Sequence, residues 1–217
     1  MPVSLVLASA SPARLAILRR AGIEPRVEVS SVDEQAVMAK LMRQAAKLRA
    51  DDPTPAEEAY LLAKVKAEDV AARTNDALVL GCDSVLEIDG KSLGKPATPK
   101  AAIARWRLMR GRDGVLHTGH WLIDARTGGE GAQPAVGEVA STVVRFCDLT
   151  DTEIAAYVES GEPLHVAGGF TIDGLGGPFI AGIDGDHHNV IGLSLPLLRY
   201  LLKGWGLTIP DLWTARS

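Results

Sequence analysis

The 217-residue chain has little cysteine, no excess of basic residues and no long apolar run. Its two cysteines, Cys82 and Cys147, lack the CxxC spacing of metal-binding pairs, so we expect reduced thiols in the core. The formal net charge of −4 argues against a nucleic-acid polymer as partner, because such partners usually require a basic face. No apolar run approaches the length of a membrane span, so we expect a cytoplasmic protein with no membrane partner.

Repeats, low-complexity tracts and clear linkers are also missing from the sequence. With 47% hydrophobic residues, a chain of this length buries a substantial core and needs no disulfide or structural metal ion for stability. Segments typical of strands alternate with segments typical of helices. We therefore expect one α/β domain over residues 1–217, with a cleft.

Two familiar site motifs fail as well. Gly94-Lys95 resembles the end of a phosphate-binding P-loop, but Pro96 takes the Ser/Thr position and residue 89 is not glycine. None of the five histidines shows the i, i+4 spacing of a helical metal pair, which argues against a zinc site. We interpret the histidines as surface or structural residues.

The most informative stretch lies near the N-terminus. The apolar run at residues 5–8 predicts a buried strand, and Ser11 before Pro12 predicts the N-cap of a helix. The free N–H groups at that helix start, the hydroxyls of Ser9 and Ser11 and the guanidinium of Arg14 together favour an anion site for phosphate or carboxylate. An ordinary capped turn from strand to helix is the alternative.

The remaining pattern predicts a series of further strands and helices. Thr54 with Glu57 forms a capping box, and Thr98 and Thr150 are expected to cap two further helices. Asp89-Gly90 predicts a tight turn between strands. Strands are expected at residues 27–29, 77–82, 85–88, 117–124, 138–146 and 179–184, and helices at 35–49, 55–73, 99–110, 151–159 and 196–202.

Two charged residues interrupt otherwise apolar patterns. Lys66 falls on the apolar stripe of the helix expected at 55–73, so it either reaches the edge or points into a cleft where an anion compensates it. Asp83 ends the buried run at 77–82, a position common in active sites, although it could merely cap the next turn.

Other polar residues also lie at the ends of elements, where ligands of open α/β sheets collect. Glu34 precedes a helix, Lys95 follows a hairpin, and Asp173 and Asn189 belong to a late glycine-rich region. Taken alone, Lys95 is equally typical of a solvated loop. Three cations together with two or three carboxylates suit a polyphosphate bound with a divalent ion, because bare carboxylates repel phosphate.

Several segments, in order, resemble the motifs of the Maf (septum-formation inhibitor) family. Nine such segments span nearly the whole chain: Ser9–Arg14, Val32–Glu34, Leu62–Ala67, Cys82–Val85, Leu93–Pro96, Gly161–Leu164, Gly168–Phe170, Asp173–Gly176 and Asn189–Gly192. Motifs that recur in the same order are far more specific than any one of them alone.

The resemblance implies a mixed-sheet α/β fold of the Maf/ITPase-like type, with two lobes flanking a central cleft, and a homodimer. It also implies a nucleoside triphosphate pyrophosphatase, which hydrolyses (d)NTPs, modified or non-canonical ones included, to the monophosphate and pyrophosphate. A divalent metal, Mg²⁺ or Mn²⁺, is the implied cofactor. A role in clearing aberrant nucleotides is what the family suggests.

The resemblance also assigns roles to residues of this chain. The metal ligands are Glu34 and Asp83, and Asp83 is alternatively the general base. The catalytic residues are Asp83, Lys66 and Lys95. The substrate-binding residues are Ser9, Ser11, Arg14, Lys66, Lys95, Asp173 and Asn189.

The chain departs from the family pattern at several positions. Ala13 replaces the first arginine of an Arg-Arg pair, so Arg14 alone carries that charge, and Gly114 replaces a histidine. Asp173 replaces a glutamine that lies near the nucleotide base in the family. An ionised carboxylate only accepts hydrogen bonds, so the family's preference for a base does not carry over to this chain. Two alternative functions remain: a phosphatase that removes the terminal phosphate, and a nucleotide-binding regulator of septum formation without significant turnover.

Overall fold

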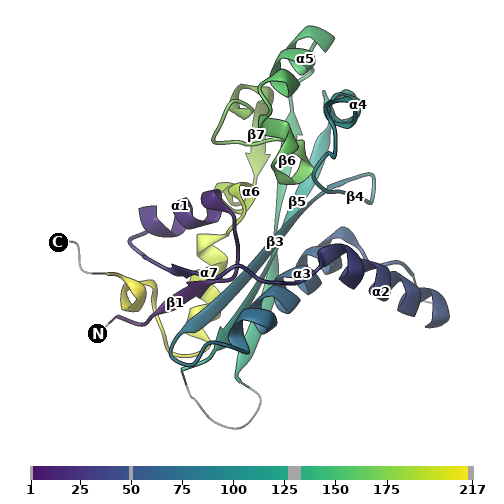
Figure 1. The fold of residues 1–217 in the computed structure, drawn as a ribbon. Helices are drawn as coiled ribbons and strands as arrows, with labels where there is room; N and C mark the ends of the chain where they lie inside the picture. Colours follow the sequence, from purple (N-terminus) through teal and green to yellow (C-terminus); the bar gives the residue numbers. More distant parts are fainter. Residues whose placement is uncertain (1, 49–50, 127–132, 215–217) are drawn as a thin grey trace.

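The computed structural model describes residues 2–48, 51–126 and 133–214, and it places their strands in one mixed sheet (Figure 1). The predicted mixed α/β class is confirmed. The strands are β1 (Leu5–Leu7), β2 (Arg26–Val27), β3 (Leu78–Ile88), β4 (Lys91–Leu93), β5 (Asp113–Asp124), β6 (Ala135–Phe146) and β7 (Ile180–Asp184).

The sheet has a parallel part and an antiparallel part. Its order is β2-β1-β3-β5-β6-β7, with β4 paired to the far end of β3. β2, β1 and β3 are parallel, whereas β3, β5, β6 and β7 are each antiparallel to the next. The long strand β3 therefore belongs to both parts.

The helices begin where the predicted caps stand. Side chains of Ser11, Thr54, Thr98 and Thr150 each accept a hydrogen bond from the first helical turn, which stabilises a helix by about 1 kcal/mol. The α-helices are α1 (Pro12–Arg20), α2 (Glu34–Leu48), α3 (Pro55–Ala71), α4 (Pro99–Met109), α5 (Asp151–Glu159), α6 (His187–Ile191) and α7 (Leu195–Lys203).

Two lobes share the long strands (Figure 1). In the first lobe, α1 and α7 cover one face of β1, β3 and β5, and α3 covers the other, so that alternate residues of β1 enter two apolar cores. In the second lobe, α4 and α5 pack Trp106 and Tyr157 against the far ends of β3, β5 and β6. β3 and β5 run from one lobe into the other.

Two glycines bring α3 unusually close to the sheet. A Cβ on Gly81 of β3 would overlap the carbonyl oxygen of Ala63, and one on Gly119 of β5 would overlap that of Ala59. Gly119 lies opposite Asp83 in the β3–β5 ladder. The close approach of the helix backbone therefore occurs beside Asp83 and sets the distance from α3 to this carboxyl group.

The structure corrects some boundaries. Asp83 does not end a strand: β3 continues without a break from Leu78 to Ile88, because Asp83 keeps its place in the ladder with β5. The strand expected at 27–29 is Arg26–Val27, and α6 is a helix that the pattern did not predict, being only five residues long. The loop expected at 127–131 lies outside the described residues.

The two cysteines differ more than the sequence predicts. Both are free, and burial raises the pKa of the Cys82 thiol to about 12, so this side chain stays a protonated core thiol. Cys147 is only half-buried, because it follows β6 at the edge of the second lobe. None of the described helices is both long and apolar enough to cross a membrane.

Candidate active site

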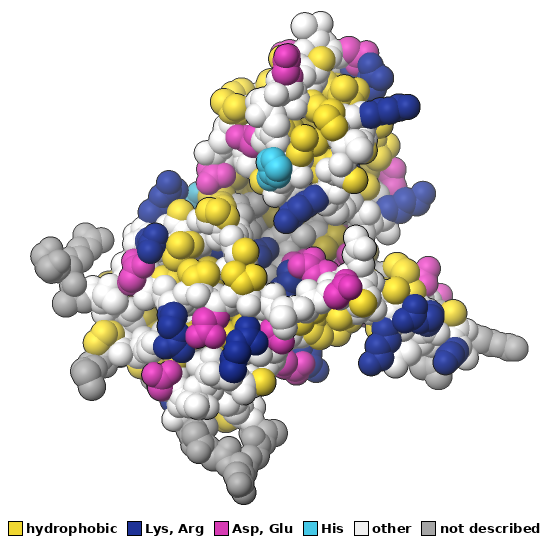
Figure 2. Space-filling view, viewed as in Figure 1, with side chains coloured by type: hydrophobic (Ala, Val, Ile, Leu, Met, Phe, Trp, Pro, Cys, Tyr) yellow, Lys and Arg dark blue, Asp and Glu magenta, His cyan; other side chains and the backbone are white. Residues whose placement is uncertain are grey.

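The candidate site lies where one edge of β3 has no neighbouring strand. β1 pairs with β3 as far as Leu80, and β4 begins to pair at Leu86. Among the described residues, no strand covers residues 81–85 on this edge. Figure 2 shows the surface hollowed between the two lobes, with basic and acidic side chains gathered along the hollow.

Lys66, Asp83 and Glu34 form a compact charged cluster on the α3 side of β3. The Lys66 Nζ atom lies 2.5 Å from Oδ1 of Asp83 and 2.6 Å from Oε1 of Glu34. Only 12% of the Lys66 side chain and 13% of the Asp83 side chain are exposed, against 52% for Glu34. The lysine on the apolar stripe of α3 is thus largely buried, and two carboxylates offset its charge.

Burial dominates the electrostatics of Asp83. It raises the pKa of this carboxyl group above the usual value, although the charges of Lys66 and Arg14 oppose the shift. A carboxylate with a raised pKa is a stronger base than an exposed one. Asp83 therefore combines partial access to the cleft with the capacity to accept a proton.

Arg14 occupies a different setting, on the α1 side of β3. Its Nε donates to the carbonyl oxygen of Gly192 at 2.7 Å, and Nη1 donates to Ser9 Oγ at 3.0 Å and to the Cys82 carbonyl at 2.8 Å. Nη2 donates to Ser84 Oγ at 3.0 Å. Four of the five guanidinium N–H groups (one on Nε, two on Nη1, one on Nη2) are thereby used inside the protein.

A buried chain of polar side chains continues from Arg14 into β5 and α6. Ser84 Oγ lies 2.9 Å from Thr118 Oγ1, which donates to the carbonyl oxygen of Asn189. The Asn189 side chain has no exposed surface, and its Nδ2 donates to the Leu116 carbonyl at 3.0 Å and to Thr142. In this structure Asn189 ties α6 to the sheet.

The carboxylates of the cluster fit a hard divalent ion. Lys66 Nζ, a cation, lies within hydrogen-bond distance of an oxygen of both Asp83 and Glu34. Carboxylate oxygens are the ligands that Mg²⁺ and Mn²⁺ favour. Two such groups that converge on one cationic position therefore suit the ion that the sequence implies.

Sequence comparison identifies the family. A family model described as a Maf-like protein matches residues 4–205. The chain belongs to the Maf family.

Its relatives cover nearly its full length. A protein of Streptomyces coelicolor named nucleoside triphosphate pyrophosphatase is 58% identical over 96% of this chain and 94% of its own length. One of the same name from Streptomyces avermitilis is 55% identical over 98% and 96%. The solved Ham1 protein of Staphylococcus aureus is 15% identical over 67% of this chain and 72% of its own, with a TM-score of 0.39, too weak a likeness to add to the fold.

The Maf motifs do not all meet at one point. The Ser9–Arg14 turn and the residues Glu34, Lys66 and Asp83 gather around the uncovered edge of β3. Lys95 and Asp173 are exposed and form no ion pair with any described residue. Lys95 follows β4, whose loop is fixed by a hydrogen bond from Arg105 to the Gly94 carbonyl.

Glu162 holds the loop that carries Asp173. Its carboxylate accepts hydrogen bonds from Tyr157 and Thr171 side chains, both at 2.7 Å, and from the backbone N–H groups of Leu175 and Gly176. These bonds lower the pKa of Glu162 despite its burial. Glu162 belongs to a predicted Maf motif, but no role was assigned to it from the sequence.

Ser84 and Thr118 belong to the hydrogen-bond network of Arg14, although the sequence assigns no role to either. Thr118 lies within β5 and carries no separate signal in the pattern, since its contacts reach Ser84 and α6 only in the folded sheet. Ser84 follows Asp83 directly in the sequence, and this position beside an acid that interrupts an apolar run is the signal that points to it.

Proposed function

We propose that this chain is a nucleoside triphosphate pyrophosphatase, which hydrolyses (d)NTPs, modified or non-canonical ones included, to the monophosphate and pyrophosphate. The observation that carries the proposal is the Lys66–Asp83–Glu34 cluster, where a buried carboxyl group of raised pKa meets a lysine at the uncovered edge of β3. Relatives of that name, matched over at least 94% of their length, support the same reaction.

The residues divide the chemistry between them. Asp83 orients a water molecule toward the α-phosphorus and accepts its proton as the new P–O bond forms. The bond from the α-phosphorus to the bridging oxygen breaks, and pyrophosphate leaves with that electron pair. Lys66 and Lys95 offset the charge that develops on the phosphate oxygens.

The turn after β1 and the metal complete the proposed site. Ser9, Ser11 and the free N–H of Arg14 bind phosphate oxygens at the start of α1. Glu34 would hold Mg²⁺ or Mn²⁺, which supplies positive charge to the triphosphate, and Asp83 is a ligand of that ion in the alternative in which it is not the base. Asp173 and Asn189 are proposed to act at the nucleoside end, Asn189 by fixing α6.

Three further proposals concern the chain as a whole. Residues 1–217 act as one domain, which is supported by β3 and β5 crossing both lobes. A homodimer and a cytoplasmic location are supported by membership of the Maf family. Sedimentation and cell fractionation test these two proposals.

A nucleotide panel with product analysis tests the reaction. The purified chain is incubated with the common NTPs and dNTPs and with methylated and other modified ones, in Mg²⁺ and in Mn²⁺. The proposal expects nucleoside monophosphate and pyrophosphate in equal amounts. Nucleoside diphosphate and orthophosphate would identify a terminal phosphatase instead, and tight binding without turnover would favour a regulator of septum formation.

A further inference from the structure

Three metal-ligating side chains meet at the start of α6, outside the proposed catalytic site. Asp186 is the N-cap of this helix, and His187 and His188 follow it directly. One ligand atom from each lies within 4.8 Å of the other two. The imidazole ring centroids of the two histidines are 4.1 Å apart, so both rings lie on the same side of the helix start.

The spacing of two of the three ligand atoms fits a tetrahedral ion. Nδ1 of His188 lies 3.4 Å from Oδ1 of Asp186. In a zinc site with metal–ligand bonds of about 2.0–2.2 Å, neighbouring ligand atoms stand roughly 3.3–3.6 Å apart. Two imidazoles and one carboxylate also match the ligand preference of zinc-like ions, whereas Mg²⁺ prefers oxygen alone.

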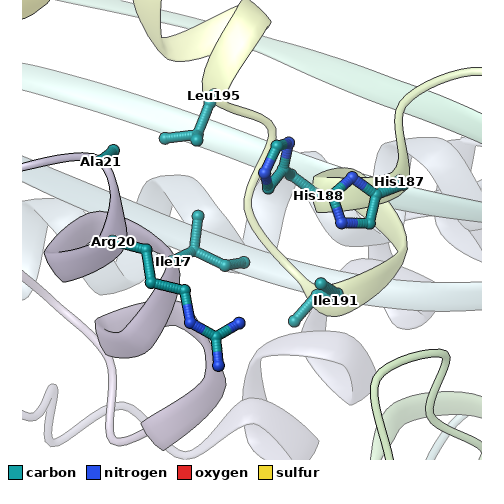
Figure 3. A pocket seen from close by; sticks show the side chains of 7 residues that line it. All are labelled: Ile17, Arg20, Ala21, His187, His188, Ile191 and Leu195. Carbon is teal, nitrogen blue, oxygen red and sulfur yellow. The ribbon is translucent and has the colours of Figure 1, made fainter.

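Open space adjoins the two imidazoles. A pocket of about 130 Å³ lies between α1, α6 and the start of α7, and both histidines line it together with the apolar side chains of Ile17, Ile191 and Leu195 (Figure 3). In this view the rings lie next to each other, and the guanidinium of Arg20 points away from them. The pocket has room for the water that completes a coordination shell of three protein ligands.

A second observation at Asp186 also points to a cation. Its Oδ2 atom is buried and accepts no hydrogen bond from any described residue, while Oδ1 accepts one from the backbone N–H of His188. A buried carboxylate oxygen without a partner is costly, and a bound cation offsets that cost.

We propose that Asp186, His187 and His188 bind a divalent transition-metal ion of the zinc type, at a site distinct from Glu34 and Asp83 and contrary to the expectation from histidine spacing. The site also bears on Arg14. α6 ends at Ile191, and the next residue, Gly192, accepts the hydrogen bond from Arg14 Nε. A metal at the start of α6 therefore stabilises the segment that holds Arg14 in place.

Calorimetric titration with Zn²⁺ tests the site on the full chain, with excess Mg²⁺ present to occupy the carboxylates of Glu34 and Asp83. We expect one saturable zinc equivalent in the wild type. His187→Ala, at an exposed position, is expected to weaken zinc binding at least about tenfold, and His187→Ala/His188→Ala to abolish it. His165→Ala, which removes an exposed histidine outside the cluster, is the matched control and keeps wild-type affinity.

Circular dichroism of the metal-free variants checks that they are folded, and if the double variant unfolds, His187→Ala decides alone. Glu34→Gln/Asp83→Asn is expected to bind zinc as the wild type does. Loss of zinc binding in that variant, undiminished binding in the histidine variants, or no saturable binding in the wild type would each overturn the proposal. Co²⁺ gives a second readout, because its visible absorption reports tetrahedral coordination through the same side chains.

Discussion

Lys66 and Arg14 are both cations beside β3, and the sequence suggests the same phosphate-binding role for both. Their surroundings differ. Lys66 contacts two carboxylates at the mouth of a cleft, whereas Arg14 is 8% exposed and donates to two backbone carbonyls and two hydroxyls. The first belongs to a reactive cluster, and the second chiefly holds the scaffold together. A charge at the right place in a motif therefore does not reveal how much of its bonding capacity is left for a ligand.

The largest expected effect is a loss of turnover when the cluster of Lys66, Asp83 and Glu34 is changed. Asp83→Asn removes the proton acceptor but keeps the size of the side chain and an oxygen for Lys66. We expect kcat to fall about 10²–10⁴-fold, the contribution typical of a general base. The unfolding free energy should stay within about 1 kcal/mol, because the burial that raises the pKa of Asp83 disfavours its charge. Steady-state kinetics and urea unfolding of the same preparation measure both. Wild-type turnover would remove Asp83 from the mechanism.

Arg14→Met should act on stability instead. The variant leaves the carbonyl groups of Cys82 and Gly192 without their donors in a buried setting, and each such loss costs about 1–3 kcal/mol. We expect the unfolding free energy to fall by about 3 kcal/mol. Arg19→Met is the control, because Arg19 and its partner Glu24 are both exposed, and exposed ion pairs contribute little to stability. A fully stable Arg14→Met protein with weakened nucleotide binding would reverse the comparison.

His120 makes the Arg14 side of β3 sensitive to acid. Burial lowers the pKa of this imidazole from 6.5 to about 4, and its Nε2 accepts the N–H of Ser194. The pKa of His120 is lower in the folded chain than in the unfolded chain. The stability that the neutral imidazole contributes to the fold is therefore complete above pH 6.5 and is lost as the pH falls toward 4. The loss amounts to about 3 kcal/mol. Chemical unfolding at several pH values measures it. His120→Gln should flatten the slope, whereas His165→Gln should not; an unchanged slope in His120→Gln would contradict the assignment.

Lys66→Met is expected to lose less stability than Arg14→Met or acid protonation of His120. It leaves the buried Asp83 without its ion pair, so we expect a loss of about 2 kcal/mol at pH 8. The loss should shrink as the pH falls and Asp83 becomes protonated, because the neutral acid needs no cation. Lys66→Met/Asp83→Asn should recover the stability, and Lys100→Met is an exposed control. A Lys66→Met loss that does not depend on pH would indicate packing rather than charge.

The sequence predicts the parts of the fold that depend on neighbouring residues. The caps at Ser11, Thr54, Thr98 and Thr150 mark helix starts because the capping side chain bonds within its own first turn. The register of Lys66 on an apolar stripe likewise predicts either an edge position or an anionic partner, because helical periodicity is a local property, and the carboxylates of Asp83 and Glu34 are that partner.

Long-range contacts account for what the sequence could not predict. Arg14 bonds to Gly192, 178 residues further along the chain, so its structural role has no local signal. Asp83 looks like the end of a strand because an acid breaks an apolar run, yet its partner in β5 is a glycine that lets α3 and Lys66 approach.

The central claim is that the cluster around Asp83 delivers water to the α-phosphorus of a nucleoside triphosphate. Hydrolysis in ¹⁸O-labelled water, followed by mass spectrometry of the products, tests this claim most directly. The account predicts one ¹⁸O atom in the nucleoside monophosphate and unlabelled pyrophosphate, with Asp83→Asn slowing the labelling in proportion to its kcat. Label in pyrophosphate or in orthophosphate would place the attack at another phosphorus and would contradict the account.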